Sequence, residues 1–181
     1  MRKLPPNTLE IIDEFNNFLD KTNAKIAKIT KMYEKHLACK KGCTHCCMNI
    51  SVLPIEFYAI GKMLKKSKKK IKLNRHKRCA FLQDRLCMIY QFRPIICRTH
   101  GLPLSHRDSH DPSRANITIC DLNFVDKIPK FKSDNTLDMD EINLELYRLN
   151  EKFIAKFKTR LPARIPFSKV VAYTKEKPSS R

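Results

Sequence analysis

Glycine is scarce in this chain of 181 residues, with three copies, and tryptophan is absent. No glycine-rich phosphate-binding loop, dinucleotide-binding fingerprint or Ser-His-Asp motif occurs in it. No apolar run approaches 18 residues, so we expect no membrane-spanning helix. The chain passes from Arg2 and Lys3 directly to two prolines, without the apolar core of a secretory signal. The sequence therefore predicts a cytoplasmic protein, and it carries no motif of a common enzyme class.

Acidic residues are few, with 18 Asp and Glu against 37 Lys and Arg, so the formal charge is +19. This charge suggests an anionic partner such as nucleic acid, or a solvated Lys-rich surface. Nine of the fourteen residues from Lys65 to Arg78 are Lys or Arg, and we call this stretch the basic insert. No aromatic residue interrupts it, so base stacking is not indicated. It favours a solvated loop, with a nucleic-acid contact as the alternative.

Cysteine, in contrast, is abundant: four of the eight copies lie within residues 39–47, with the spacing C-x3-C-x2-C-C. A disulfide framework is disfavoured, because the adjacent Cys46 and Cys47 cannot easily bridge and the cytoplasm is reducing. An apolar core segment is disfavoured by the polar residues between the thiols, which are Lys40, Lys41, Thr44 and His45. Two thiolates separated by two residues can turn back onto one ion, and Gly42 relieves crowding at the bend. The segment therefore predicts metal binding.

The other four cysteines follow in three short elements. Cys79 and Cys87 lie on two apolar runs that flank Gln83-Asp84-Arg85, which predicts a hairpin with both thiols near one another. Cys97 follows Pro94, which suits the first turn of a helix that ends at Gly101. Cys120 follows an alternating apolar segment, after a stretch, residues 102–116, that reads as an irregular loop.

Three helices are predicted from apolar spacing. The first has Asn7 and Glu10 as a capping box and runs to Leu37, either unbroken or interrupted at Asn23. Its apolar positions are Ile11, Ile12, Phe15, Phe18, Leu19, Ile26, Ile29, Tyr33 and Leu37. The second starts at Pro54, after a short extended segment, and reaches about Lys66. The last is capped by Asp138 and Glu141 and buries Ile142, Leu146, Leu149, Phe153 and Phe157.

These patterns predict a mainly α fold of the small α+β kind, a metal-organised helical domain with a short β-hairpin around the cysteine cluster. Four segments are expected. Residues 1–38 form an N-terminal amphipathic helical arm, and residues 39–124 form the cysteine-cluster domain, including the basic insert at 65–78. Residues 125–174 form a C-terminal helix that packs on this domain, and residues 175–181 form a disordered tail.

The cysteine blocks resemble those of the YkgJ-like or CxxCxxCC family, whose members are described as zinc- or iron-chelating proteins. The matching stretches are CKKGCTHCC with the later Glu56, then CAFLQDRLCMIYQFRPIICRTHG, then CDLNF, so the likeness covers about Cys39 to Phe124. The first spacing, x3 instead of x2, departs from the family pattern at Cys39. The resemblance implies metal chelation, and the family includes relatives of flagellin lysine methylase.

Thiolate-rich sites select zinc or iron, including iron–sulfur clusters. Eight thiols suffice for two four-thiolate sites, or for one site with spare thiols, and neighbouring side chains of an extended segment point opposite ways. Cys46 and Cys47 are therefore candidates for different sites. Nearby cations would favour the thiolate forms, and the candidates are Lys40, Lys41, Arg78 and Arg98. The predicted metal ligands, with Cys39 the weakest candidate and Cys120 next, are Cys39, Cys43, Cys46, Cys47, Cys79, Cys87, Cys97 and Cys120.

Three classes of function are compatible with these residues. The first is a metal-binding protein that chelates zinc or iron for structure or storage. The second is an iron-dependent redox or protein-modifying enzyme. The third is a zinc-stabilised nucleic-acid-binding protein that uses the basic insert. No residue pattern identifies a catalytic group, so the sequence leaves the question of enzymatic activity open.

Overall fold

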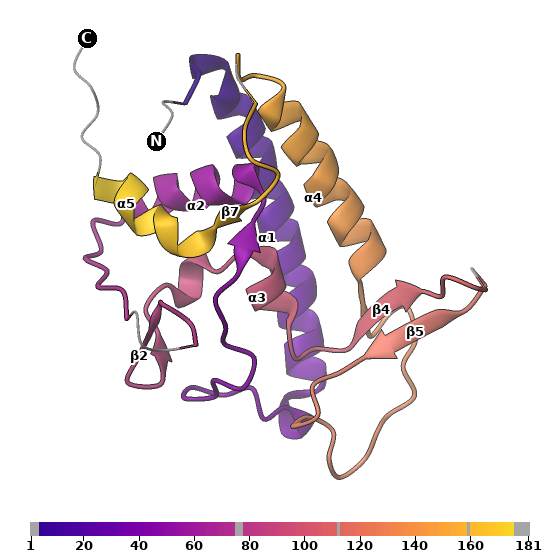
Figure 1. The fold of residues 1–181 in the computed structure, drawn as a ribbon. Coiled ribbons are helices and arrows are strands. Elements are labelled where there is room, and N and C mark those ends of the chain that lie inside the picture. Colours follow the sequence, from indigo (N-terminus) through magenta and orange to yellow (C-terminus); the bar gives the residue numbers. More distant parts are fainter. Residues whose placement is uncertain (1–3, 75–77, 112, 159, 176–181) are drawn as a thin grey trace.

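The computed structural model describes residues 4–74, 78–111, 113–158 and 160–175 (Figure 1). The helices are α1 (Leu9–Met32), α2 (Pro54–Lys66), α3 (Ile95–Thr99), α4 (Met139–Ile154) and α5 (Val170–Lys175). The strands are β1 (Ser51–Val52), β2 (Leu82–Gln83), β3 (Leu86–Cys87), β4 (Leu104–Arg107), β5 (Ala115–Thr118), β6 (Leu137–Asp138) and β7 (Ile165–Pro166). Short 3-10 helices span Pro6–Thr8, Glu34–His36, Tyr90–Phe92 and Phe167–Lys169. Helices hold 45% of the described residues and strands 11%, which confirms the mainly helical α+β class.

The two longest helices, α1 and α4, lie antiparallel along one side of the molecule (Figure 1). Lys25 pairs with Glu141 at 2.9 Å and Lys152 with Glu14 at 2.8 Å, one pair toward each end. Such exposed pairs contribute little free energy, so the association depends on the apolar faces. The residues buried on these faces are Ile11, Ile12, Phe15, Leu19 and Ile29 of α1, and Ile142, Leu146, Leu149 and Phe153 of α4. Most of both predicted faces is confirmed, but Phe18, Ile26 and Phe157 are only partly buried. Helix α1 ends at Met32, before the predicted Leu37, and Phe157 lies beyond the end of α4.

The predicted cap at the start of α4 is confirmed, whereas the predicted cap at the start of α1 was wrong. Asp138 caps α4 as predicted, because its carboxylate accepts hydrogen bonds from the backbone N–H groups of Asp140 and Glu141. Asn7 does not cap α1: it lies in the 3-10 turn before the helix, and the N-cap residue is Thr8. The Thr8 hydroxyl donates to the carbonyl of Pro5 instead. Asn23 lies inside an unbroken α1.

Helix α2 begins at Pro54, as predicted, and crosses between α1, α4 and α5. Most of its first eight residues are buried, Glu56 among them at 3% exposure. The Glu56 carboxylate accepts hydrogen bonds from the backbone N–H groups of Leu53 at 3.3 Å and Ile95 at 3.0 Å. It therefore satisfies the first residues of two helices, α2 and α3, with one side chain.

The C-terminal part of the chain returns to the start of α2. Strand β7 pairs antiparallel with β1, with Val52 opposite Ile165. The chain then forms α5, which packs against α2. The expectation that the helix starting near Asp138 is the last one was wrong, because α5 is a short helix whose six residues give no clear periodicity. Of the predicted disordered tail 175–181, Lys175 ends α5 and residues 176–181 lie outside the described residues.

Two hairpins accompany the helices. The predicted hairpin is confirmed: β2 and β3 are antiparallel, and Asp84 and Arg85 form a two-residue turn with φ values of 47° and 62°. The second hairpin, β4 with β5, replaces the irregular loop expected at residues 102–116. It was missed because most of its side chains are polar and none is fully buried. Strand β6 joins β4 in parallel.

One hydrophobic core extends through the described residues. Its buried members range from Ile11 in α1 to Val171 in α5, and they include Phe81, Ile89 and Ile95 beside the cysteine segments. In the basic insert, Ile71 is buried while the neighbouring lysines are exposed. No described helix has the length and hydropathy that crossing a membrane would require.

Candidate metal centre

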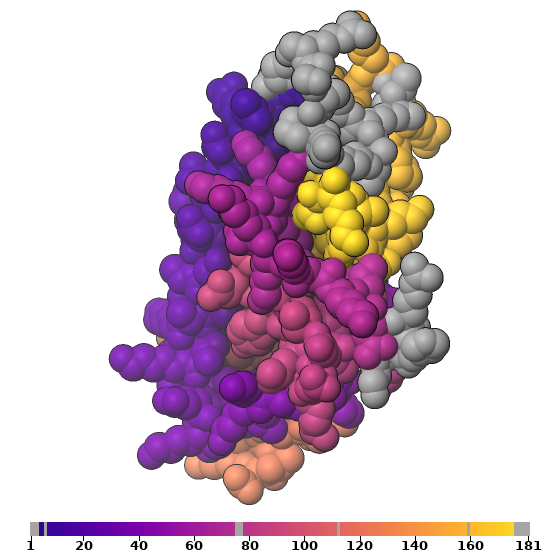
Figure 2. All heavy atoms as spheres, turned by 90° about the vertical axis from the view of Figure 1, so that its left-hand side faces the viewer, coloured from indigo at the N-terminus to yellow at the C-terminus, as the bar shows by residue number. Residues whose placement is uncertain are grey.

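The cysteines gather at the end of the molecule away from the start of α1. They come from the loop after α1, from the β2–β3 hairpin, from α3 and from the residue two positions after β5. In Figure 2 the hairpin and α3 segments lie below α5, with the segment near β5 at the lower edge. None of the eight thiols is in a disulfide, and seven of them are half-buried, the exposed exception being Cys39. The fold thus places four distant segments side by side.

Two successive tight turns shape the first cysteine loop. The backbone N–H of Cys43 donates to Lys40 O and that of Cys47 donates to Thr44 O, both at 3.0 Å. Gly42 has a φ of +93°, which agrees with its predicted role at the bend. The hairpin turn is attached to this loop, because Arg85 Nε donates to Gly42 O at 3.2 Å.

An inner group of thiols consists of Cys47, Cys79, Cys87 and Cys97. Burial, together with the charges of Cys46, Cys79 and Cys87, raises the pKa of Cys47 to about 11. Burial and the charge of Cys79 raise the pKa of Cys97 to about 12, and the charge of Cys87 acts in the same direction. Burial also raises the pKa of Cys87, with Cys79 adding to the effect. The hairpin thiols Cys79 and Cys87 therefore lie close enough to Cys47 on one side and to Cys97 on the other to oppose the ionisation of both.

The other four thiols lie toward the outer side of this group. Burial and the charges of Cys39 and Cys43 raise the pKa of Cys46, and the charge of Cys46 in turn acts on Cys47. Burial raises the pKa of Cys120, and Cys39 is among the further charges that raise it. Cys46 thus interacts with Cys39 and Cys43, and it also acts on Cys47 and Cys97, so it links the two groups of thiols.

A buried asparagine holds Cys39 in place. Asn123 is 3% exposed, and its Oδ1 accepts from the backbone N–H of Ala38 at 2.7 Å. Its Nδ2 donates to Gly101 O and lies 3.4 Å from Cys39 Sγ. Gly101 has a φ of +98°, and a Cβ at this position would lie 2.6 Å from Cys39 Sγ. The thiol therefore occupies the space that any side chain at residue 101 would need.

Replacing Gly101 by Ala is expected to displace Cys39 and destabilise the fold. Positive φ costs a non-glycine residue about 1–3 kcal/mol, and the contact with the sulfur adds about 1 kcal/mol or more. Gly42→Ala is the matched control, because Gly42 has a similar φ of +93° and nothing within 4 Å of its Cβ position. Urea unfolding of both variants measures the difference. Equal losses of unfolding free energy in the two variants would show that the contact between a Cβ at residue 101 and Cys39 Sγ does not affect stability.

The cations that act on the thiols only partly match the predicted ones. Lys40, Lys41 and Arg78 are exposed. Burial raises the pKa of Cys46, Cys87 and Cys97, and the positive charge of Arg93 acts in the opposite direction on all three. The sequence favours Arg93 as a group that packs and supports the metal ligands over a catalytic role, but the Arg-Pro pair alone does not show which thiols its side chain faces.

Arg93 and the remaining cations are held by nearby groups. The Arg93 guanidinium lies 3.7 Å from the centre of the Tyr90 ring. The predicted Arg98 interacts with Cys97, but its guanidinium also donates to the carbonyls of Gln91 and Arg93 and to Asn23 Oδ1. Lys69 of the basic insert acts on Cys87. Part of the basic insert therefore offsets thiolate charge.

The donor set fits a thiophilic metal ion. Ionising several adjacent thiols in a half-buried site is unfavourable unless a cation compensates their charge. Zinc and iron both bind four thiolates in this way. Within the part of the chain that the structure describes, no three of the eight sulfurs lie within 4.8 Å of one another. The described thiols are therefore near one another electrostatically but do not have the spacing of three ligands on one ion.

Sequence reasoning missed one group of potential ligands. His45 Nε2, Cys120 Sγ and an Asp121 carboxylate oxygen all lie within 4.8 Å of one another. His45 lies within the cysteine-rich loop, and Asp121 follows Cys120 directly. His45 and Asp121 are too far apart in the sequence for their positions to indicate a contact. The fold brings them together.

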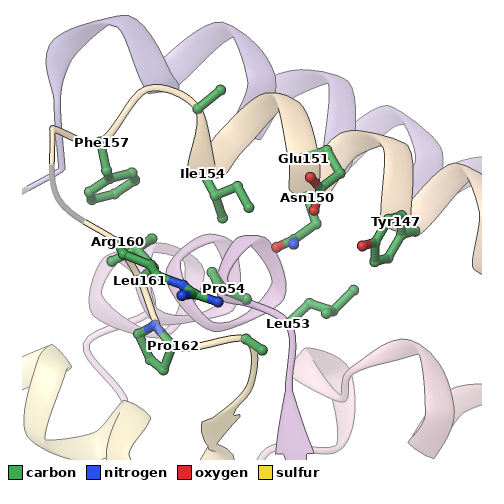
Figure 3. A pocket seen from close by; sticks show the side chains of 12 residues that line it. Leu53, Pro54, Tyr147, Asn150, Glu151, Ile154, Phe157, Arg160, Leu161 and Pro162 are labelled. Atoms are coloured by element: carbon green, nitrogen blue, oxygen red, sulfur yellow. The ribbon is translucent and has the colours of Figure 1, made fainter.

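A cavity lies elsewhere in the described part of the molecule. It has a volume of about 460 Å³ and lies between the start of α2, the end of α4 and residues 160–163 (Figure 3). Apolar side chains and a few polar ones line it, among them Leu53, Tyr147, Asn150, Glu151, Arg160 and Leu161. No cysteine lines it, so the cavity is separate from the candidate metal centre.

Comparison with known proteins gives one match. Residues 38–121 match the family CxxCxxCC, described as "Putative zinc- or iron-chelating domain". No curated protein and no solved structure matches the chain. The matched residues contain the loop, both hairpins, α2, α3 and all eight cysteines. Residues 38–121 are therefore similar to the zinc- or iron-chelating domain described for the CxxCxxCC family.

Proposed function

We propose that this protein chelates zinc or iron through its cysteine cluster, with Cys47, Cys79, Cys87 and Cys97 as the principal thiolates. The observation that carries the proposal is that Cys79 and Cys87 act on both Cys47 and Cys97, which brings thiols of the loop, the hairpin and α3 near one another. The family description supports metal chelation in general. Cys43 and Cys46 lie beside the group as further thiolates, with Cys39 and Cys120 on its outer side.

The chemistry of such a centre follows from its donors. A metal bound by four thiolates would supply cross-links between segments, and an iron–sulfur cluster would add one-electron chemistry. Four protein ligands leave no open position for substrate, which is typical of structural zinc sites. Arg93 and Lys69 would reduce the negative charge of the thiolates, and Arg98 would tie α3 to α1 through Asn23. We therefore favour a structural or storage role over catalysis.

Cysteine substitution with metal analysis tests the proposal. In protein purified without oxygen, Cys79→Ser and Cys97→Ser are expected to lower metal content, or to weaken metal affinity by on the order of 100-fold or more, because each removes a direct ligand. Cys39→Ser is the matched control and should have a milder effect. Elemental analysis identifies zinc or iron, and a brown colour distinguishes an iron–sulfur cluster from colourless zinc. Unchanged stoichiometry and affinity in both variants would refute the proposal.

A further inference from the structure

Three side chains with different donor atoms meet at the surface beside the cysteine cluster. His45 Nε2 lies 3.0 Å from Asp121 Oδ1, and Cys120 Sγ lies 3.5 Å from the same oxygen. All three donors fall within 4.8 Å of one another. Ligands of a tetrahedral zinc ion with ordinary bond lengths are separated by roughly 3.4–3.6 Å. The three atoms therefore already have nearly the spacing that one bound ion requires.

The segment that presents Cys120 and Asp121 is firmly held. Residues 120–123 form a tight turn, closed by the hydrogen bond from Asn123 N to Cys120 O at 2.9 Å. The backbone N–H of Leu122 donates to the sulfur of Cys120. The buried Asn123 side chain in turn binds Ala38 N and Gly101 O, which fixes the turn to the loop after α1 and to the end of α3. The donors of Cys120 and Asp121 are thus placed by buried contacts.

His45 comes from the facing turn. It lies between Thr44 and Cys47, whose backbone groups are hydrogen-bonded at 3.0 Å. The side chains of His45 and Asp121 are 50% and 74% exposed. An ion pair this exposed contributes on the order of 0–1 kcal/mol, so pairing alone gives little reason for the arrangement. A cation bound by His45, Asp121 and Cys120 together would account for this arrangement.

We propose that His45, Cys120 and Asp121 form a second metal site that binds one Zn²⁺-like divalent cation. Mixed nitrogen, sulfur and oxygen donors suit a borderline ion such as zinc and do not suit an iron–sulfur cluster. Three protein ligands leave a fourth position for water or for Cys39, which lies within electrostatic reach of Cys120. This site is exposed and incomplete, so its ion exchanges more readily than the metal of the inner thiolates. The inference rests on the proposed function only in taking the inner thiolates to hold a separate ion.

Zinc titration of the full chain separates the two sites. The protein is purified without oxygen, its tightly bound metal is measured, and Zn²⁺ alone is then titrated against a chromophoric chelator. His45→Ala and Asp121→Asn are expected to keep the tight metal and to weaken the second binding event on the order of 100-fold. His110→Ala and Asp126→Asn are matched controls, since both residues are exposed and lie outside the group. These surface substitutions leave the core intact, which a thermal melt verifies.

The outcomes distinguish this inference from the proposed function. Loss of the second event in His45→Ala and Asp121→Asn, with Cys79→Ser losing the tight metal, supports both. If the double variant His45→Ala with Asp121→Asn binds the same amount of Zn²⁺ with the same affinity as the unaltered chain, the second site is refuted while the inner site stands. If Cys79→Ser and Cys97→Ser both leave the tight metal unchanged, the proposed function fails, and the second site is still decided by the His45 and Asp121 variants.

Discussion

Removing the metal from the reduced protein is expected to abolish the cooperative unfolding transition of the cysteine region. Residues 37–50 contain no helix or strand, and most of them are at least partly exposed. The β2–β3 hairpin has two residues in each strand, too few to be stable alone. Structural zinc supplies on the order of 10 kcal/mol to such domains, compared with about 5–15 kcal/mol for the total stability of a typical protein. Without the metal, few contacts would hold the cysteine loop and the β2–β3 hairpin in place.

Thermal melts and amide hydrogen exchange of chelated, reduced protein measure this effect. We expect exchange to accelerate most in residues 38–50 and 79–90, and less between α1 and α4, which share their own apolar contacts. The control is the same sample after zinc or iron is restored, because it separates metal loss from damage by the chelator. A chelated sample that kept its full native melting transition would contradict the expectation.

Replacing Glu56 by Ala is expected to lower the free energy of unfolding by about 2–6 kcal/mol. The substitution leaves two buried backbone N–H groups, those of Leu53 and Ile95, without an acceptor. Each such group costs about 1–3 kcal/mol. Since Leu53 precedes α2 and Ile95 begins α3, which carries Cys97, the loss should also disturb the metal centre. Urea unfolding measures the change, and Glu151→Ala, at an exposed position of α4, should cost less than about 0.5 kcal/mol.

The isosteric Glu56→Gln variant adds a test by pH. Burial raises the pKa of Glu56 above 4.5, although its two backbone hydrogen bonds act in the opposite direction. Between the ordinary and the raised pKa the folded state therefore holds a proton that the unfolded state has lost. The unaltered protein should lose stability relative to Glu56→Gln as pH rises through this window. Comparing the two proteins cancels the proton release that accompanies metal binding. A difference independent of pH, or no loss in Glu56→Ala, would show that Glu56 is not the buried acceptor described.

The parts of the fold that the sequence predicted are those whose signals are local. Pro54 begins α2 and Asp138 caps α4, because each acts within one turn of its own helix. Asp84 and Arg85 lie between two short apolar runs, which is enough to indicate the β2–β3 hairpin. The prediction that Asn7 caps α1 was wrong because residues Pro6–Thr8 form a 3-10 turn, which places Thr8 at the N-cap position.

The missed features depend on contacts between distant residues. Strands β4 and β5 are held by backbone pairing and by contact with β6 and α4, and only β5, through Ile117, belongs to the apolar alternation recognised before Cys120. The role of Arg93 depends on where the Arg-Pro turn directs its side chain relative to the loop and hairpin. His45 and Asp121 come together only because Asn123 ties the turn after β5 to the loop after α1. The thiols could be identified by spacing alone, but their neighbours could not.

Because β1 pairs with β7, the core can be completed only after the C-terminal part of the chain has been synthesised. A ribosome adds all eight cysteines, the last at residue 120, before it adds α4, β7 and α5. During that interval α2 lacks the helices that cover it, and its apolar residues are open to the chaperones that bind nascent chains. Metal can bind the emerging thiols at this stage, whereas the core must wait for the C-terminal residues to arrive. The order of translation thus separates metallation from completion of the core in time.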